Sequence, residues 1–259
     1  MLQEATREAI RFEVNDHIAT ITLNRPDKMN ALNRAMRKEL QDAFREVKYN
    51  PDIWIAIITG EGRAFCSGKD LLEKLPDEDG LVMSNDELYM FERHIYKPLI
   101  TAINGACLAQ GAGLALGSDI RVMADHATFG WPQVKRGISS VSGPTMFATE
   151  VPLAVALKYL MRGIPMTATE ALELHVVHEL VPLDNLMETT QRWAREILEA
   201  SPIAVQGIKE AAVRAQGIAD LHERITMARG VANRVLLSDD SKEGILAFKE
   251  KRQPRWSGR

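Results

Sequence analysis

The first half of the chain alternates short apolar runs with stretches in which apolar residues recur at helical spacing. The apolar runs that predict β-strands are residues 9–14, 17–23, 53–59, 98–104, 119–125 and 127–131. Helices are predicted at residues 35–47 and from about Gln110. Such an alternation is typical of a layered α/β fold. The pattern places the end of the sheet near residue 130.

The second half of the chain is predicted to be largely helical from Gly143 onward. Ser201 before Pro202 is a typical helix start, and Thr167 with Glu170 fits a capping box. The helical stretches are residues 152–161, 167–176, 183–200, 201–215 and 218–237. We therefore expect helices to dominate the C-terminal hundred or so residues.

Two further patterns concern the surface. Residues 73–87 combine proline, glycine and several acids, which is typical of a mobile loop or a short irregular helix, and this segment is a candidate lid. One face of the last predicted helix is apolar, and it belongs either to the core of one chain or to a contact between subunits. The residues of this face are Leu221, Ile225, Ala228 and Val231.

Composition narrows the class of protein. The 259 residues carry a formal net charge of −3, with 46% hydrophobic and 26% charged residues, so no excess of positive charge favours nucleic acid as a partner. The two cysteines, Cys66 and Cys107, are too few for a disulfide framework or a cysteine-rich zinc site. Neither a membrane-spanning apolar run nor a secretory signal core is present in the sequence. We expect a reduced, cytoplasmic protein with no membrane partner.

Two segments carry the candidate chemistry, residues 64–71 and residues 101–120. In the first, Gly68 permits a tight turn that leaves the Lys69 N–H free at the start of a following helix, with Asp70 as a capping residue. In the second, glycines surround Gln110 where a helix begins. Each segment alone also fits an ordinary strand-to-helix turn. Together they predict an oxyanion hole, which stabilises negative charge on a carbonyl oxygen such as that of a thioester.

A nicotinamide cofactor is not expected from the second segment. Its glycines do not follow the G-x-G-x-x-G spacing of a dinucleotide site. Asp119 also comes too early in the chain to be the acid that binds the ribose.

The order of the motifs resembles the crotonase family, also called the enoyl-CoA hydratase/isomerase superfamily. The motifs are LNRPDKMNALN, AFCSGKDL, INGACLAQGAGLALGSD, ATFGWPQVKRGI and GIPMTATEALELHVVHELVP. The likeness extends from about Arg11 to the C-terminus. It implies an α/β fold with a crotonase-like spiral of ββα units over residues 1–200. It also implies a C-terminal helical region, residues 201–259, that belongs to the same functional unit and forms a homotrimer or a dimer of trimers.

The resemblance also implies a set of site residues. The backbone N–H groups of Lys69 and Gln110 would form the oxyanion hole, although the family usually has glycine or alanine where Gln110 stands. Coenzyme A would be bound as part of the substrate, with no permanently bound cofactor and no metal. The implied coenzyme A contacts are Lys28, Met29, Ala31, Ala64, Ser67, Gly68, Asp70, Leu71, and Phe248 and Lys251 near the C-terminus, Phe248 coming from an adjacent subunit.

One departure from the family pattern changes the expected chemistry. Hydratases of the family carry two glutamates that position water and exchange a proton, whereas this chain has Gly113 and Gln133 at those positions. An amide orients water or substrate but has no useful pKa, so the usual two-glutamate hydration is not expected. Other candidates for proton transfer or for orienting the acyl group are His94, Glu92, Asp86, Glu87, Gln133, Ser139, Ser140, Ser142 and the Lys69 ammonium group.

Three functions remain open from the sequence. The first is an acyl-CoA enzyme that stabilises a thioester enolate, nominally an enoyl-CoA hydratase or isomerase, with decarboxylation or hydrolysis of a C–C or thioester bond as alternative reactions. The second is a protein that binds CoA esters without hydratase chemistry. The third is a serine hydrolase of related fold, which would need a histidine and an acid beside Ser67 or Ser140.

Overall fold

The computed structural model describes residues 8–73 and 81–259. Its strands are β1 (Ile10–Asn15), β2 (Ile18–Leu23), β3 (Ile55–Gly60), β4 (Ala64–Cys66), β5 (Leu99–Ile103), β6 (Ala106–Leu108), β7 (Ile120–Ala124), β8 (Thr128–Gly130), β9 (Met166–Thr167) and β10 (Glu179–Val181). Its α-helices are α1 (Arg34–Tyr49), α2 (Asn85–Arg93), α3 (Gln110–Gly117), α4 (Ala148–Glu150), α5 (Leu153–Arg162), α6 (Ala168–Glu173), α7 (Leu186–Leu198), α8 (Pro202–Ala215), α9 (Leu221–Leu236) and α10 (Asp239–Glu250). Short 3₁₀ turns are η1 (Pro26–Lys28), η2 (Pro132–Arg136) and η4 (Leu183–Asn185), and η3 (Gly143–Phe147) is a π-helical turn.

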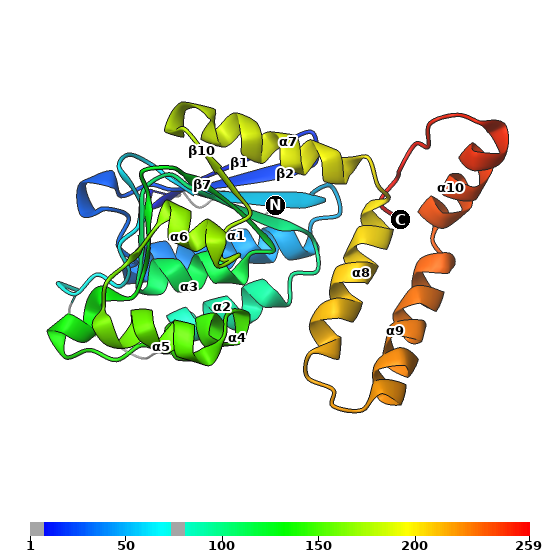
Figure 1. The fold of residues 1–259 in the computed structure, drawn as a ribbon. Helices are drawn as coiled ribbons and strands as arrows, with labels where there is room; N and C mark the ends of the chain where they lie inside the picture. The colour runs from blue at the N-terminus through cyan, green and yellow to red at the C-terminus, as the bar shows by residue number, and fades with distance from the viewer. Residues whose placement is uncertain (1–7, 74–80) are drawn as a thin grey trace.

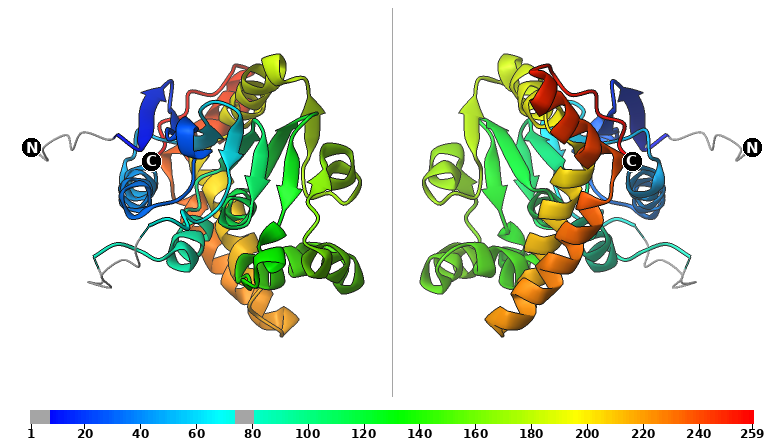
Figure 2. Two further views of the ribbon diagram at one scale, coloured as in Figure 1. Left: turned by 90° about the vertical axis from the view of Figure 1, so that its left-hand side faces the viewer. Right: turned by 90° about the vertical axis from the view of Figure 1, so that its right-hand side faces the viewer.

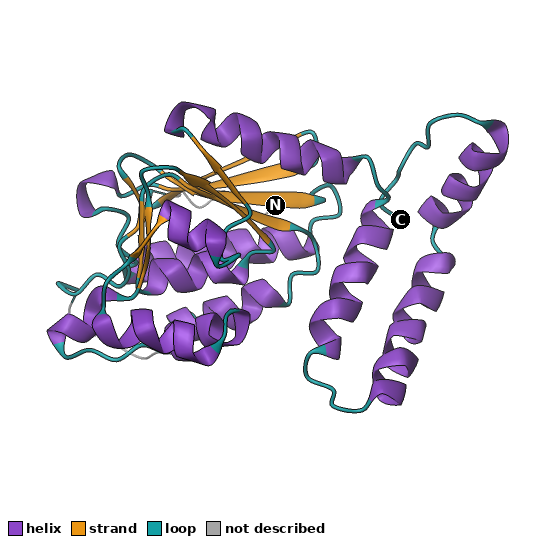
Figure 3. Ribbon diagram, in the orientation of Figure 1, coloured by secondary structure: helices purple, strands orange, loops and turns teal. Residues whose placement is uncertain are grey.

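The strands form two sheets (Figure 3), and from β3 to β8 the chain alternates between them. The larger sheet has the order β1-β2-β3-β5-β7-β10 and is parallel except for the β1–β2 pair. The smaller sheet has the order β4-β6-β8-β9. The units β3-β4-α2 and β5-β6-α3 each place one strand in either sheet before a helix. This repeat confirms the expected α/β spiral of ββα units.

Helices cover both faces of the larger sheet (Figures 1 and 2). Side chains alternate between the faces along β3, because successive residues of a strand point to opposite sides. Ile55 and Ile57 pack with Ala194 of α7 on one face, whereas Ala56 and Ile58 belong to the main core on the other. A strand that is buried on both sides needs a continuous apolar run, which explains the sequence of β3.

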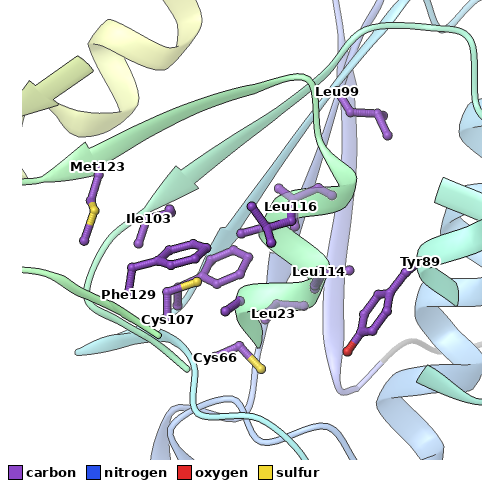
Figure 4. Packing of buried hydrophobic residues seen from close by; sticks show 14 of the residues in the cluster. Leu23, Cys66, Tyr89, Leu99, Ile103, Cys107, Leu114, Leu116, Met123 and Phe129 are labelled. Carbon is purple, nitrogen blue, oxygen red and sulfur yellow. The ribbon is translucent and has the colours of Figure 1, made fainter. Parts of the chain in front are cut away.

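Helix α3 lies inside the main core (Figure 4). Every residue of this helix after Gln110 is buried, and Leu114 and Leu116 pack among the strands' side chains. The close-up also shows Cys66 and Cys107 near the start of α3. The surrounding core therefore fixes the position of the helix N-terminus.

The main elements of the first half are confirmed, and the sequence interpretation needs correction in the second half. The prediction that the sheet ends near residue 130 is wrong, because β10 joins the larger sheet beside β7. Strand β9 likewise adds to the smaller sheet. Helix α10 lies in the C-terminal region that the resemblance implies to be helical, but the residue pattern did not mark it as a separate helix. Of the candidate lid, residues 74–80 lie outside the described residues, and residues 85–87 form the capped first turn of α2.

The C-terminal helices α8, α9 and α10 extend as an arm from the rest of the chain (Figure 1). On α9, Val231 is buried, whereas Leu221 and Ile225 are 67% and 49% exposed. Most of the apolar face that the sequence placed on this helix is thus outside the core of a single chain. In the described residues, no helix is both long and apolar enough to cross a membrane.

A buried carboxyl group links α2 to the end of α3. Glu92 is fully buried, and its Oε1 accepts a hydrogen bond of 3.1 Å from the Ser118 hydroxyl, which in turn accepts one of 2.7 Å from Thr101. Glu92 Oε2 has no hydrogen-bond partner among the described residues. Burial raises the pKa of Glu92 well above its usual value, despite the opposing effects of the Ser118 hydrogen bond and the Lys209 charge.

We expect Glu92→Gln to stabilise the protein at about pH 8 by about 1 kcal/mol or more. The unfolded chain releases the Glu92 proton near the ordinary glutamate pKa of 4.5, whereas the folded chain releases it only at higher pH, so wild-type stability is lost as the pH rises above that value. Urea unfolding over a pH series measures this effect. The advantage of the variant should disappear at about pH 4, where both states are protonated. A difference independent of pH would contradict this assignment.

Candidate active site

A cavity of about 180 Å³ lies where the turn after β4, the first turn of α2, the start of α3 and the segment from Pro132 to Ser142 meet. Nine residues that the sequence proposed for the site line it together: Ser67, Lys69, Leu71, Asp86, Gln110, Gln133, Ser139, Ser140 and Ser142. The cavity also includes Tyr89 and Arg136. Residues distant in the sequence therefore share one site.

The turn after β4 presents one free backbone donor. Gly68 has φ +103°, a conformation that favours glycine, and a Cβ there would lie only 2.8 Å from the Cβ of Ala109. The neighbouring segment pairs with this turn, since Leu32 N–H donates to Gly68 O and Asp70 N–H donates to Leu32 O. Between these bonds, the Lys69 N–H has no acceptor within the described part of the chain. It is available to a ligand in the cavity.

The start of α3 presents a second free donor. Ala109, the residue before the helix, has φ +53° and ψ −113°, a strained conformation for alanine that is fixed by its N–H bond of 2.7 Å to Gly130 O. Gln110 is the first helical residue, and its N–H has no protein acceptor among the described residues. Gln110 N lies 3.4 Å from the position that a Cβ on Gly68 would occupy. The two free N–H groups therefore belong to backbone segments that contact each other.

Tyr89 connects α2 to this pair of donors. Its side chain is buried, and its hydroxyl donates a hydrogen bond of 2.9 Å to the carbonyl oxygen of Gln110. Burial raises the pKa of Tyr89 well above its usual value, so the hydroxyl keeps its proton. Protonated Tyr89 consequently positions the first turn of α3 through this hydrogen bond. The sequence analysis did not identify this residue.

The space beside Gly113 is already filled. A Cβ on Gly113 would lie 2.7 Å from the Ser142 Cβ and 2.8 Å from the Tyr89 Cζ, closer than real Cβ contacts. Trp131 Nε1 holds the Ser142 hydroxyl through a hydrogen bond of 3.1 Å. A glutamate at position 113 would need the tyrosine ring and this serine to move. The glycine is thus part of a packed arrangement.

The two glutamine amides of the cavity have unsatisfied oxygens. Gln110 Oε1 and Gln133 Oε1 are both buried, and neither has a hydrogen-bond partner among the described residues. A buried polar atom without a partner costs about 1–3 kcal/mol. A ligand with a donor group, or a water molecule, would satisfy these atoms, which favours a polar occupant.

Two of the candidate serines accept hydrogen bonds from neighbouring residues of the protein. Ser140 accepts a hydrogen bond of 3.1 Å from the Gly143 N–H, and Ser142 is held by Trp131. Among the described residues, no histidine lines the cavity. His94 is exposed at the end of α2, where its Nδ1 lies 2.6 Å from Met90 O. A Ser-His-acid arrangement is therefore not formed there.

Several residues proposed for coenzyme A gather beside the cavity. Ser67 N–H donates to Met29 O at 3.0 Å, and the segment from Met29 to Leu32 runs along the turn after β4. Lys28 is exposed, whereas Ala31 is buried and Ala64 is fully buried, the Ala64 carbonyl accepting from the Asn30 side chain at 2.8 Å. The two remaining proposed contacts, Phe248 and Lys251, lie on or just after α10 and do not line the cavity.

Asp70 has a different role from the one predicted. Residues 69–73 are not helical, so the expected helix start at Lys69 is wrong. The Asp70 carboxylate instead accepts hydrogen bonds of 3.1 Å from Arg25 and from the Leu72 N–H. These contacts fix the loop beyond the turn.

The chemistry of metals and thiols is limited in this site. Burial raises the pKa of Cys66 to about 12 and the pKa of Cys107 well above its usual value, so neither is a nucleophilic thiolate near neutral pH. No group of three or more His, Cys, Asp or Glu side chains within residues 8–73 and 81–259 is arranged to hold a metal ion.

Comparison with known proteins decides the family. The family described as enoyl-CoA hydratase/isomerase matches this chain over residues 13–259. The chain belongs to this family. The resemblance inferred from the order of the motifs is thereby confirmed.

Members of the enoyl-CoA hydratase/isomerase family match nearly the full length of the chain. The (E)-benzylidenesuccinyl-CoA hydratase of Thauera aromatica is 32% identical, covering 96% of this chain and 99% of that protein. The carnitinyl-CoA dehydratase of Salmonella arizonae is 36% identical, covering 97% of this chain and 99% of that protein. The crystal structure of an enoyl-CoA hydratase/isomerase from Mycobacterium paratuberculosis superposes with a TM-score of 0.89 at 34% identity. The match covers 98% of this chain and 100% of that chain. The spiral fold is therefore shared with solved members.

Proposed function

We propose that the protein is an acyl-CoA enzyme that stabilises the enolate of a thioester substrate. The proposal rests on one observation, the adjacent free N–H groups of Lys69 and Gln110 at the wall of the cavity. Two donors aimed at one oxygen form an oxyanion hole, and removal of such a donor typically lowers the rate by about 10²–10³-fold. The substrate class comes from relatives that are named for CoA esters.

The thioester makes a resident cofactor unnecessary for this step. Its carbonyl group accepts the electron pair left on the α-carbon, and the two N–H groups stabilise the resulting negative charge on oxygen. Hydration or isomerisation is the nominal reaction. Decarboxylation and hydrolysis of a C–C or thioester bond also pass through a stabilised oxyanion. The substrate incubations described next distinguish these reactions from hydration.

The test is hydrogen exchange at the α-carbon of a saturated substrate. Purified protein with butyryl-CoA in D₂O should incorporate deuterium at that carbon, as followed by mass spectrometry, because the enolate forms and is reprotonated. Parallel incubations with enoyl-, malonyl-type and β-ketoacyl-CoA esters identify the complete reaction. Binding of these esters without exchange or turnover would instead favour a CoA-ester-binding protein. Absence of binding would contradict the proposal altogether.

Gln133→Glu should raise hydration of a short enoyl-CoA, since general acid–base groups contribute about 10²–10⁴-fold. The glutamate would occupy the place of the buried, unpartnered Gln133 amide. Hydration is measured by the loss of enoyl-thioester absorbance.

The matched control is Gly113→Glu, at the other position where the family carries a glutamate. This variant should be less stable than the wild type and should show no increase in hydration rate, because Ser142 and Tyr89 fill the space at that residue. Negligible turnover of Gln133→Glu with the ester still bound would contradict the prediction.

We further propose that the chain assembles as a homotrimer or a dimer of trimers through its C-terminal arm. Support comes from the large exposed apolar side chains on this arm. These are Ile208, Leu221, Ile225, Leu236, Leu237, Ile245, Leu246 and Phe248. Exposed apolar surface of this kind marks an interaction site.

Light scattering should therefore give three or six times the mass of one chain. Leu221→Lys together with Ile225→Lys should shift the protein toward smaller species, because both side chains are exposed on one face of α9. A wild-type mass equal to that of one chain would contradict the assembly.

A further inference from the structure

Asp86 is the one carboxylate among the described residues that line the cavity. It belongs to the first turn of α2, whose N-terminus is fixed by the capping box between Ser84 and Glu87. The Asp86 side chain has no hydrogen bond or ion pair in the described residues. The cavity thus contains a carboxylate that no protein group neutralises directly.

Tyr89 fixes where this carboxylate lies relative to the free N–H pair. Residues three apart on a helix share a face, so Asp86 and Tyr89 are neighbours on α2. The Tyr89 hydroxyl contacts the Gln110 carbonyl, and its ring occupies the space beside Gly113. The face of α2 that carries Asp86 therefore covers the position from which a glutamate at residue 113 would act.

We propose that Asp86 is the proton-transfer residue of this site, delivered from α2 in place of the two missing glutamates. This inference rests on the proposed function. The Asp86 carboxylate removes the α-proton of the thioester. As the C–H bond breaks, its electron pair forms the C=C bond of the enolate, and the negative charge moves to the oxygen that faces Lys69 and Gln110. The resulting carboxylic acid then returns the proton to carbon.

The surroundings of Asp86 suit a base of this kind. Burial raises its pKa first, and repulsion from Glu87 raises it further. The charged groups in the same cavity are Lys69 and Arg136, and its other titratable group is the protonated Tyr89.

Helix α1 packs against α2, and two of its cations contact groups other than Asp86. Arg37 lies 3.9 Å from Glu73, and Lys48 lies over the Phe91 ring. Helix α3 contributes no titratable side chain.

The deciding experiment repeats α-proton exchange with Asp86→Asn. We expect the exchange rate to fall by about 10²-fold or more, with the dissociation constant for butyryl-CoA nearly unchanged. Asp86→Glu should restore part of the rate, because it returns a carboxylate on a longer side chain. Circular dichroism and the dissociation constant establish that each variant is folded.

Glu87→Gln is the matched control and provides a second readout. Glutamine keeps the capping box, so the helix start should persist. Removal of the negative charge lowers the pKa of Asp86, so the acid limb of the pH–rate profile should move to lower pH while the plateau rate changes little. A merely structural role of Asp86 would not produce this shift.

The outcomes separate the two proposals. If the wild type binds the ester but exchanges no deuterium, the proposed function fails. If the wild type exchanges deuterium and Asp86→Asn exchanges it at a similar rate, the role of Asp86 is overturned while the proposed function stands. If Asp86→Asn does not fold, the Glu87→Gln profile decides, and an unmoved acid limb overturns the inference.

Discussion

The close approach of the turn after β4 to the N-terminus of α3 is the constraint on which the rest of the site depends. Without a side chain at Gly68, the turn comes within contact distance of Ala109 and Gln110. Gly68 has a positive φ that glycine adopts readily, whereas Ala109 has a strained conformation that the surrounding core maintains. The free N–H groups result directly, because each donor lies at a position where regular secondary structure offers it no acceptor.

The composition of the cavity follows from what packs around this contact. Tyr89 and Ser142 occupy the space that Gly113 leaves, and the two glutamine amides present buried oxygens without partners. The charged residues that line the cavity are Asp86, Lys69 and Arg136. A cavity with unsatisfied amides and charges of both signs suits a polar acyl group better than a purely aliphatic one.

The sequence predicts the parts of this site that depend on local chain conformation. The strands around β3, β5 and β7 follow from their apolar runs, and the glycine turns mark the two donor segments. Two other features depend on how α2 packs against α3, which no local pattern encodes. These are the contact of Tyr89 with Gln110 and the position of Asp86 in the wall of the cavity. Strand β10 is also missed, because three residues at a sheet edge give too short a pattern.

Helix α2 connects the proposed base, Asp86, to the wall of the cavity that carries the Gln110 N–H. The same turn of helix carries the carboxylate and the tyrosine that anchors the opposite wall. A sliding or tilting of this helix would therefore displace the base and disturb the electrophilic side in a single movement. The carboxylate and the anchoring tyrosine therefore move as one rigid unit.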